Sequence, residues 1–288
     1  MREIDLQAPR GIEMPVFTFL THGDTRSGKT AFSGTFPRPL VLADVTEKGY
    51  ETLRDENWND EITPRFEPGV APIVWGIEKE SDVAEAIPQI EPLVKSGRVK
   101  TIIVSSISFY SDLIFNSLLM RQEKTDTRRA YGDLGTHLRN LRIKIHGLGV
   151  NVVWEALAKH PETDDPVGRP MIPGQQADKF AAGVDFIFFL KVDQPKPTEP
   201  PQFNIYTKRL GNYIAGNRLG SRAALLPNPM RGSYTTLLTS LGYDVDAIRK
   251  SFPPVTQATV KPVAPVATKP PVKVVSVGSP AVKSAAAK

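Results

Sequence analysis

The chain contains no cysteine, which excludes disulfide bonds, thiolate metal sites and a cysteine nucleophile. No apolar run approaches the roughly 20 residues that a helix needs to cross a bilayer. The N-terminal residues, Met1 to Asp5, also lack the hydrophobic stretch of a secretory signal. We therefore expect a cytoplasmic protein.

The segment 252–288 contains no acidic residue and is rich in Pro, Val, Ala, Thr, Ser and Lys. It cannot bury enough apolar area to offset the entropy of ordering, so we predict a disordered tail after a folded body over 1–251. The tail holds five lysines: Lys261, Lys269, Lys273, Lys283 and Lys288. Without these five, the 36 basic residues of the chain become 31, which equals its 31 acidic residues. Because the body is neutral, any affinity for nucleic acid must come from local patches or from the tail.

Residues 23–30 match G-x-x-x-x-G-K-[ST], the pattern of a phosphate-binding loop. The apolar, β-branched stretch 15–21 before the loop predicts a buried strand. The short residues after it suit a helix that begins at Gly28 and ends before Pro37. A strand, a glycine loop and a helix in this order are the context in which the motif binds nucleotides.

The chemistry of this loop follows from its residue types. Gly23 and Gly28 allow dihedral angles that turn successive N–H groups inward, at the positive end of a helix. Lys29 would reach the β- and γ-phosphates of ATP, and the Thr30 hydroxyl would ligate Mg²⁺. The predicted nucleotide-binding residues are Gly23, Asp24, Thr25, Arg26, Ser27, Gly28, Lys29 and Thr30.

Apolar runs and helical spacings alternate along the rest of the body. Strands are predicted over 39–43, 73–77, 99–104, 151–154, 184–192 and 203–207, and helices over 48–60, 83–94, 107–121 and 133–147. Such alternation indicates an α/β fold with a mostly parallel central sheet covered by helices on both faces. The last two strands have no helix between them, which suggests an antiparallel edge.

Phosphate-loop proteins need an acid at the end of a second strand to hold the water shell of Mg²⁺. The run 100–106 has the right position, but Ser105 stands where the aspartate is expected, so Mg²⁺ should bind more weakly. Asp44 and Glu47 follow the strand over 39–43, and one of them could orient the attacking water as general base. A solvent-facing loop at 44–49 is the alternative.

The order of these elements resembles the RecA-type ATPase core, especially the Sak-like group of phage recombination ATPases that act with single-strand annealing. The resemblance covers roughly residues 13–225 and is carried by 23–30, 44–53, 99–106 and 213–220. It implies ATP and Mg²⁺ as cofactors, a ring or filament of identical subunits, and the host cytoplasm if the chain is phage-encoded.

The resemblance also implies roles for single residues. Glu47 matches the catalytic base of the family, with Asp44 as its competitor, and Ser105 takes the position of the strand-end aspartate. The late basic motif, which reaches a neighbouring subunit's γ-phosphate, keeps Arg218 but has Gly216 in place of the lysine. At the γ-phosphate sensor position, Lys159 and His160 are better candidates than Glu155, which phosphate would repel unless it contacts metal or water.

Two segments could contact single-stranded DNA. Residues 121–131 combine basic charge with an aromatic platform, and the candidates are Arg121, Lys124, Arg128, Arg129 and Tyr131. The long loop 159–176, which contains Arg169, lies where RecA-type proteins carry DNA-binding loops. The tail could instead grip nucleic acid or recruit a single-strand-binding protein.

Three functions stay open at this point. The first is an ATP-hydrolysing DNA recombination or annealing factor. The second is a nucleotide-binding switch or scaffold with weak or no hydrolysis, which Ser105 and Gly216 favour. The third is a helicase loader or motor ATPase on the same core.

Overall fold

The computed structural model describes residues 14–38, 40–45, 48–54, 58–61, 63–67, 72–121, 127–194, 196 and 201–251. The tail predicted over 252–288 lies outside these residues. A nine-stranded sheet forms the centre, with the order β3-β2-β4-β5-β1-β7-β8, while β6 pairs with β5 and β9 with β7. The strands are β1 (Thr18–Gly23), β2 (Leu40–Asp44), β3 (Ile73–Gly76), β4 (Thr101–Ser105), β5 (Asn151–Lys159), β6 (Arg169–Pro170), β7 (Phe186–Asp193), β8 (Gln202–Tyr206) and β9 (Gly216–Asn217).

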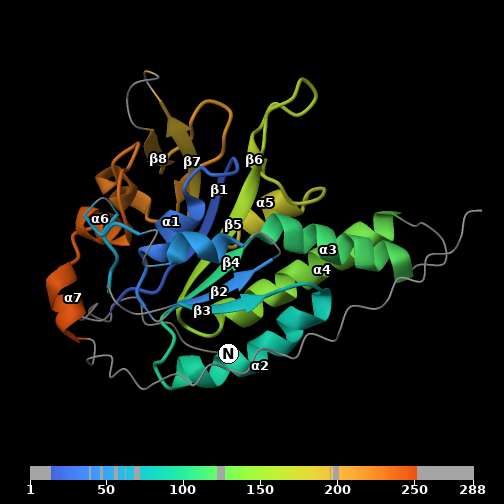
Figure 1. Cartoon of the computed structure of the whole chain (residues 1–288). Helices are drawn as coiled ribbons and strands as arrows, with labels where there is room; N and C mark the ends of the chain where they lie inside the picture. The colour runs from blue at the N-terminus through green and yellow to red at the C-terminus, as the bar shows by residue number, and fades with distance from the viewer. Residues whose placement is uncertain are drawn as a thin grey trace, which may run out of the picture. The chain divides into compact units, whose positions relative to one another are not determined.

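The pairings from β3 to β7 are all parallel, and those of β6, β8 and β9 are antiparallel. The predicted class, a mostly parallel central sheet covered by helices with an antiparallel edge, is confirmed (Figure 1). The helices are α1 (Lys29–Gly34), α2 (Glu80–Lys95), α3 (Ile107–Arg121), α4 (Thr127–His146), α5 (Gln176–Ala181), α6 (Tyr234–Ser240) and α7 (Val245–Ser251), with 3₁₀ helices η1 (Gly49–Leu53) and η3 (Gly220–Leu225).

Two apolar clusters lie on the two faces of the sheet, because alternate residues of a strand point to opposite faces. On one face, Leu20 and Trp154 of the sheet pack with apolar side chains of α2, α3, α4 and α5. On the other face, Phe19 and Val153 pack with Phe32 of α1 and with residues of α6 and α7. Phe19 stacks on Phe186 of the neighbouring strand, with ring centroids 4.8 Å apart.

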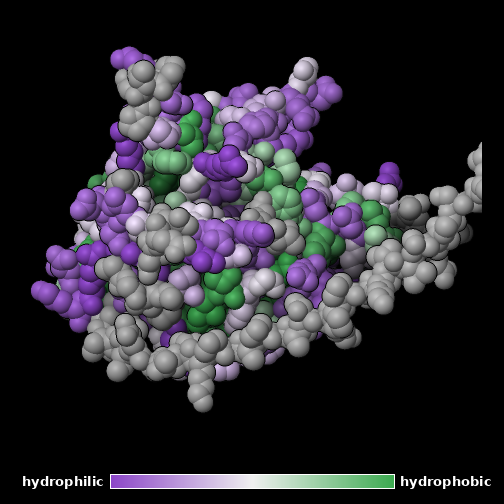
Figure 2. Space-filling model, in the orientation of Figure 1, coloured by the Kyte–Doolittle hydropathy of each residue, from purple (hydrophilic) through white to green (hydrophobic). Residues whose placement is uncertain are grey.

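The structure differs from the sequence predictions in three places. The helix predicted over 48–60 is the short η1, since the segment has few apolar residues to pack. Strand β5 continues to Lys159, five residues beyond its predicted end. The segment 159–176, predicted as a loop, contains β6 and the start of α5. The β5–β6 hairpin projects from the sheet (Figure 1), and its surface is hydrophilic (Figure 2).

None of the described helices is both long and apolar enough to cross a membrane.

Candidate functional site

The glycine loop leaves the sheet at the carboxyl end of β1 and leads directly into α1. Gly28 is the N-cap of α1 with φ 88°, a left-handed conformation that favours glycine. Gly23 is required for a different reason: a Cβ there would lie 2.2 Å from the Leu190 carbonyl oxygen. The Lys29 ammonium donates to the carbonyl oxygens of Gly23 at 3.0 Å and Asp24 at 2.8 Å, so it lies over the loop where phosphates would bind.

A buried carboxylate on β5 joins the loop to the neighbouring strands. The Thr30 hydroxyl donates to Glu155 Oε2 at 2.9 Å, and the Ser105 hydroxyl donates to the same oxygen at 2.8 Å. A threonine that donates its proton to a carboxylate keeps its oxygen lone pairs for a cation. Glu155 therefore holds Thr30 in the state that a Mg²⁺ ligand needs.

The strand register explains why these side chains meet. Asp44 pairs with Ser105 and Ser105 with Glu155, so residues from β2, β4 and β5 form one row across the sheet. The row lies at the carboxyl edge, on the face that α1 covers. In a parallel sheet this edge is where ligands bind.

Glu155 is fully buried, and burial raises the pKa of its carboxyl group. Hydrogen bonds from hydroxyl groups and the charge of Lys29 act in the opposite direction and favour the carboxylate. Its second oxygen, Oε1, is buried and has no hydrogen-bond partner among the described residues. An oxygen in that state is a suitable acceptor for a metal-bound water.

These residues fit a Mg²⁺ ion that keeps most of its water. In the described part of the chain, no group of three or more His, Cys, Asp or Glu side chains could hold a metal by itself. Mg²⁺ in nucleotide sites does not need such a group, because it is bound by one or two protein ligands together with phosphates and water. The donor set here is Thr30 with Glu155 behind it, and Ser105 supplies a hydroxyl without charge.

Asp44 and the start of η1 lie beside this donor set. Asp44 is only 4% exposed. A Cβ on Gly49 would lie 3.4 Å from Ser105 Oγ, 3.6 Å from Thr30 Oγ1 and 3.8 Å from Asp44 Oδ1. The segment that follows β2 thus returns to the site. Glu47, the other candidate base, lies outside the described residues, between Val45 and Gly49 in the chain.

Arg218 lies far along the strands from the phosphate loop of its own subunit. It follows β9, which pairs with Phe186 and Ile187 at the amino end of β7, whereas Gly23 is level with Leu190. Its guanidinium donates to the carbonyl of Ala182, just after α5. A role for Arg218 at a γ-phosphate would therefore require the site of another subunit.

The residues predicted to contact nucleic acid are partly engaged with other side chains. Arg121 pairs with Glu80 at 2.9 Å, and Arg129 approaches Asp133 at 3.8 Å. The Tyr131 ring packs on Phe115, with centroids 4.6 Å apart. Arg128 is exposed on the first turn of α4, and Lys124 lies outside the described residues. Arg121 thus lies at the C-terminal end of α3, and Arg128, Arg129 and Tyr131 lie in the first turns of α4.

The cations of the β5–β6 hairpin are also paired. Lys159 bonds Asp165 at 2.9 Å, and Arg169 bonds both Asp165 at 2.7 Å and Asp178 at 2.8 Å. His160 instead contacts the phosphate loop: its Nε2 is 3.0 Å from Asp24 Oδ1, and its Nδ1 is 2.6 Å from the Tyr213 hydroxyl. Of the two predicted sensor residues, His160 is the one in contact with the phosphate loop.

A second histidine lies inside the sheet directly before the loop. His22 Nε2 is 2.7 Å from the Ile214 carbonyl oxygen, so the neutral ring donates there. Burial lowers the pKa of His22 to about 4. The ring is therefore uncharged at neutral pH and ties β1 to the segment before β9.

The sequence did not predict that Glu155 would join Thr30 and Ser105. The predicted strand ended at Trp154, which placed Glu155 just after the strand, near the phosphates. The signal that could have found it is one carboxylate in a run of otherwise uncharged residues, from Asn151 to Ala158. A carboxylate is almost never fully buried unless it has a partner, so such a residue points to a site.

The fold and this loop define a phosphate-loop nucleotide-binding core, and comparison with protein families agrees. Residues 17–219 match the family described as AAA domain, and the chain belongs to that family. Among solved structures, a KaiC-like protein from the hyperthermophilic archaeon Pyrococcus horikoshii OT3 is similar at 15% identity and a TM-score of 0.40. That similarity covers 70% of this chain and 82% of the archaeal one. No curated protein sequence matches.

Proposed function

We propose that this chain is a Mg²⁺-dependent ATPase that acts on single-stranded DNA in recombination or annealing and works as an assembly of identical subunits. The observation that carries the ATPase part is the contact of Thr30 and Ser105 with buried Glu155, beside the phosphate loop. A loop that only binds phosphate would not need a buried carboxylate at this position, because the negative charge of the carboxylate repels phosphate. A carboxylate is useful there when a cation lies between it and the phosphates.

The residues divide the work as follows. Backbone N–H groups of 23–30 and the Lys29 ammonium would bind the phosphates, and Thr30, held by Glu155, would ligate Mg²⁺. A Mg²⁺ ion held there would supply positive charge against the charge that develops on the phosphate oxygens. Glu47 or Asp44 accepts the proton of the attacking water, since Asp44 ends β2 beside the site and Glu47 follows it in the chain.

The cation that completes the site comes from a neighbouring subunit in this proposal. Developing charge on the γ-phosphate needs a positive group beyond Lys29. Arg218 is the candidate, and it lies near the amino ends of the parallel strands, whereas the phosphate loop lies at their carboxyl ends. This placement suits a head-to-tail contact, in which the amino ends of one subunit's strands face the phosphate loop of the next subunit. Such contacts generate rings or filaments.

The second candidate function is a nucleotide-dependent switch with little hydrolysis. Ser105 favours it, because a hydroxyl brings no charge to the metal. Measuring ATP turnover with and without single-stranded DNA separates the two functions. DNA-stimulated turnover supports the recombination ATPase, while tight ATP binding without turnover supports the switch.

A further inference from the structure

A row of cations and glycines runs along one face of α4. Arg128, Gly132, Gly135, Arg139 and Arg142 follow one another at spacings of four, three, four and three residues, which places them on one side of the helix. Arg142 lies 14 positions after Arg128, so the row extends about 21 Å at 1.5 Å per residue. It starts in the predicted DNA-binding segment and continues away from it.

Four members of this row, Gly132, Gly135, Arg139 and Arg142, line a groove of about 380 Å³ between α4 and α5. Gln176 and Lys179 of α5 line the groove opposite Gly135 and Arg139. The two glycines of α4 have different surroundings. A Cβ on Gly132 would meet nothing within 4 Å, whereas a Cβ on Gly135 would lie 2.6 Å from the Gln176 side chain. The groove is therefore lined by amide, hydroxyl and cationic groups together with the apolar side chains of Leu138 and Phe180.

The positive charge of the groove is not balanced by acids. Among the described residues, Arg139, Arg142 and Lys179 form no ion pair with a carboxylate, in contrast to the paired Arg121, Arg129 and Arg169. Arg142 donates to the backbone carbonyls of Lys179 and Phe180, and burial together with nearby Arg218 and Arg139 lowers its pKa. Like charges held together in this way destabilise one another, and a bound anion would relieve that repulsion.

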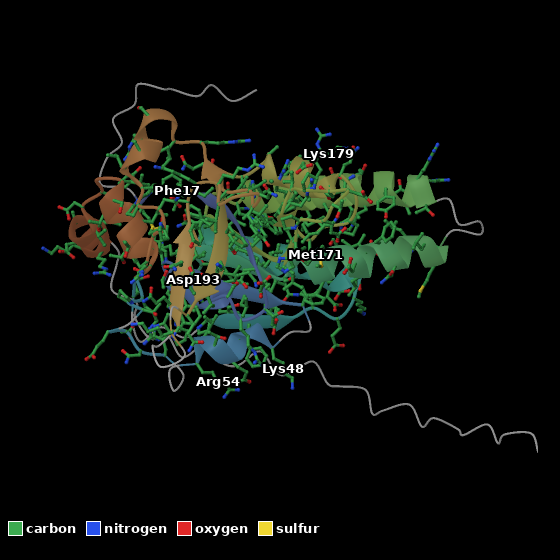
Figure 3. All side chains as sticks on the ribbon, turned by 90° about the horizontal axis from the view of Figure 1, so that it is seen from above. Phe17, Lys48, Arg54, Met171, Lys179 and Asp193 are labelled. Atoms are coloured by element: carbon green, nitrogen blue, oxygen red, sulfur yellow. The ribbon has the colours of Figure 1, made fainter. Side chains whose placement is uncertain are left out.

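We propose that the α4–α5 groove, lined by Gly132, Gly135, Arg139, Arg142 and Lys179, binds the phosphate backbone of single-stranded DNA, with Arg128 further along the same side of α4. The inference rests on the proposed function for the identity of its partner. The phosphates of an extended single strand repeat along its length, so several of them can face cations spaced along one side of a helix. The groove lies on the face of the sheet opposite α1, and Lys179 and Lys48 lie on opposite sides of the molecule (Figure 3).

The test uses the full chain and a fluorescent 20-nucleotide oligothymidylate, with anisotropy measured over a range of salt concentrations. Arg139→Ser combined with Lys179→Ser removes two exposed cations of the groove and spares Arg142, which supports α5. The matched control is Lys95→Ser combined with Arg98→Ser, an equal loss of charge at two exposed positions at the C-terminal end of α2. Unchanged melting temperatures and ATP affinity verify that both variants fold.

The groove variant should bind the oligonucleotide at least about tenfold more weakly, and its salt slope should flatten by about 1.4, from roughly 0.7 for each lost phosphate contact. The control pair should change either quantity by much less. Equal losses in both variants, or an unchanged groove variant, would overturn the proposal. Equal affinity for a duplex of the same length would overturn the assignment to a single strand.

The same samples separate this inference from the proposed function. If the oligonucleotide stimulates ATP turnover equally in wild type and in the groove variant, the proposal of a DNA-dependent ATPase is supported and the assignment of the groove as the DNA-binding site is wrong. If the groove variant loses binding as expected but wild-type turnover never responds to DNA, the groove is supported and the DNA-dependent ATPase is wrong.

Discussion

The Thr30 hydroxyl donates a 2.9 Å hydrogen bond to Glu155 Oε2, which links the first turn of α1 to a strand residue 125 positions later. The same carboxylate oxygen accepts from Ser105. Ser105 stands where sequence patterns expect an acid at the end of β4. In the proposed function, Glu155 on the next strand of the sheet takes the place of that acid, and metal binding depends on it.

Replacing Glu155 by Gln should weaken Mg²⁺-dependent ATP binding by about 10- to 100-fold, the usual cost of losing a group that orients a metal ligand. Binding of ATP without Mg²⁺ should change little or improve, because a negative charge beside the phosphates is removed. Calorimetric titration with and without Mg²⁺ measures both. Glu162→Gln, the same change at an exposed position, is the control. A weaker affinity in the absence of Mg²⁺ as well would contradict a metal-linked role.

The choice of general base is tested by Glu47→Gln and Asp44→Asn. The base variant should lose about 10²- to 10⁴-fold in turnover while ATP stays bound. We expect this of Glu47→Gln, and single-turnover assays with bound ATP measure it. If Asp44→Asn has this effect and Glu47→Gln does not, the two roles are exchanged.

Ser105→Asp should make the folded protein depend on Mg²⁺. The new carboxylate would replace a hydroxyl that lies 2.8 Å from Glu155 Oε2, so two buried acids would repel each other without a cation. We expect a lower melting temperature in EDTA and a larger rise on adding Mg²⁺ than in the wild type. Ser105→Ala, which adds no charge, serves as the control. Equal Mg²⁺ responses in all three proteins would argue against a metal near this row.

The parts of the fold that could be predicted from the sequence are those with local signals. Apolar runs such as 99–104 and 184–192 mark buried strands wherever they occur, and the glycine loop carries its own pattern. The row of Asp44, Ser105 and Glu155 has no local signal, because it arises from the register of three strands that are distant in the chain. Helix α5 was not predicted for a related reason, because its six residues lie beside a Pro/Gly-rich segment and carry little local signal. The helix is instead held by a contact that is distant in the chain, the packing of Phe180 against Trp154 with ring centroids 5.0 Å apart.

Acid should destabilise the protein through His22. Its pKa in the folded state is about 4, below the ordinary 6.5, so the unfolded chain takes up the proton first as the pH falls. The stability that the neutral ring contributes is present above pH 6.5 and is lost between pH 6.5 and 4, by about 3 kcal/mol in total. Urea unfolding of wild type and His22→Gln across this range measures the difference, with His160→Gln as the exposed control. A His22→Gln variant with an equally steep acid loss would refute the assignment.

Arg218→Ala should lower turnover by about 10³-fold or more while ATP affinity stays unchanged, because its guanidinium would act on another subunit's nucleotide. Mixing Arg218→Ala with Lys29→Ala subunits should restore part of the activity, since intact sites then form at some contacts. Turnover in a dilution series, with the assembly followed by light scattering, measures this. A protein that stays monomeric with ATP and DNA, and whose turnover per subunit does not vary with concentration, would exclude a site shared between subunits.

The central claim is that 23–30 and Glu155 form a Mg²⁺–ATP site, and the most direct test is calorimetric titration of Mg²⁺–ATP into wild type and Lys29→Ala. Lys29 is 8% exposed, and its ammonium donates to oxygens of the loop itself. The melting temperature of the variant verifies that it folds. We predict saturable binding of one nucleotide per subunit to the wild type, and no measurable binding to Lys29→Ala at an unchanged melting temperature. Equal affinity in the two proteins would contradict the account.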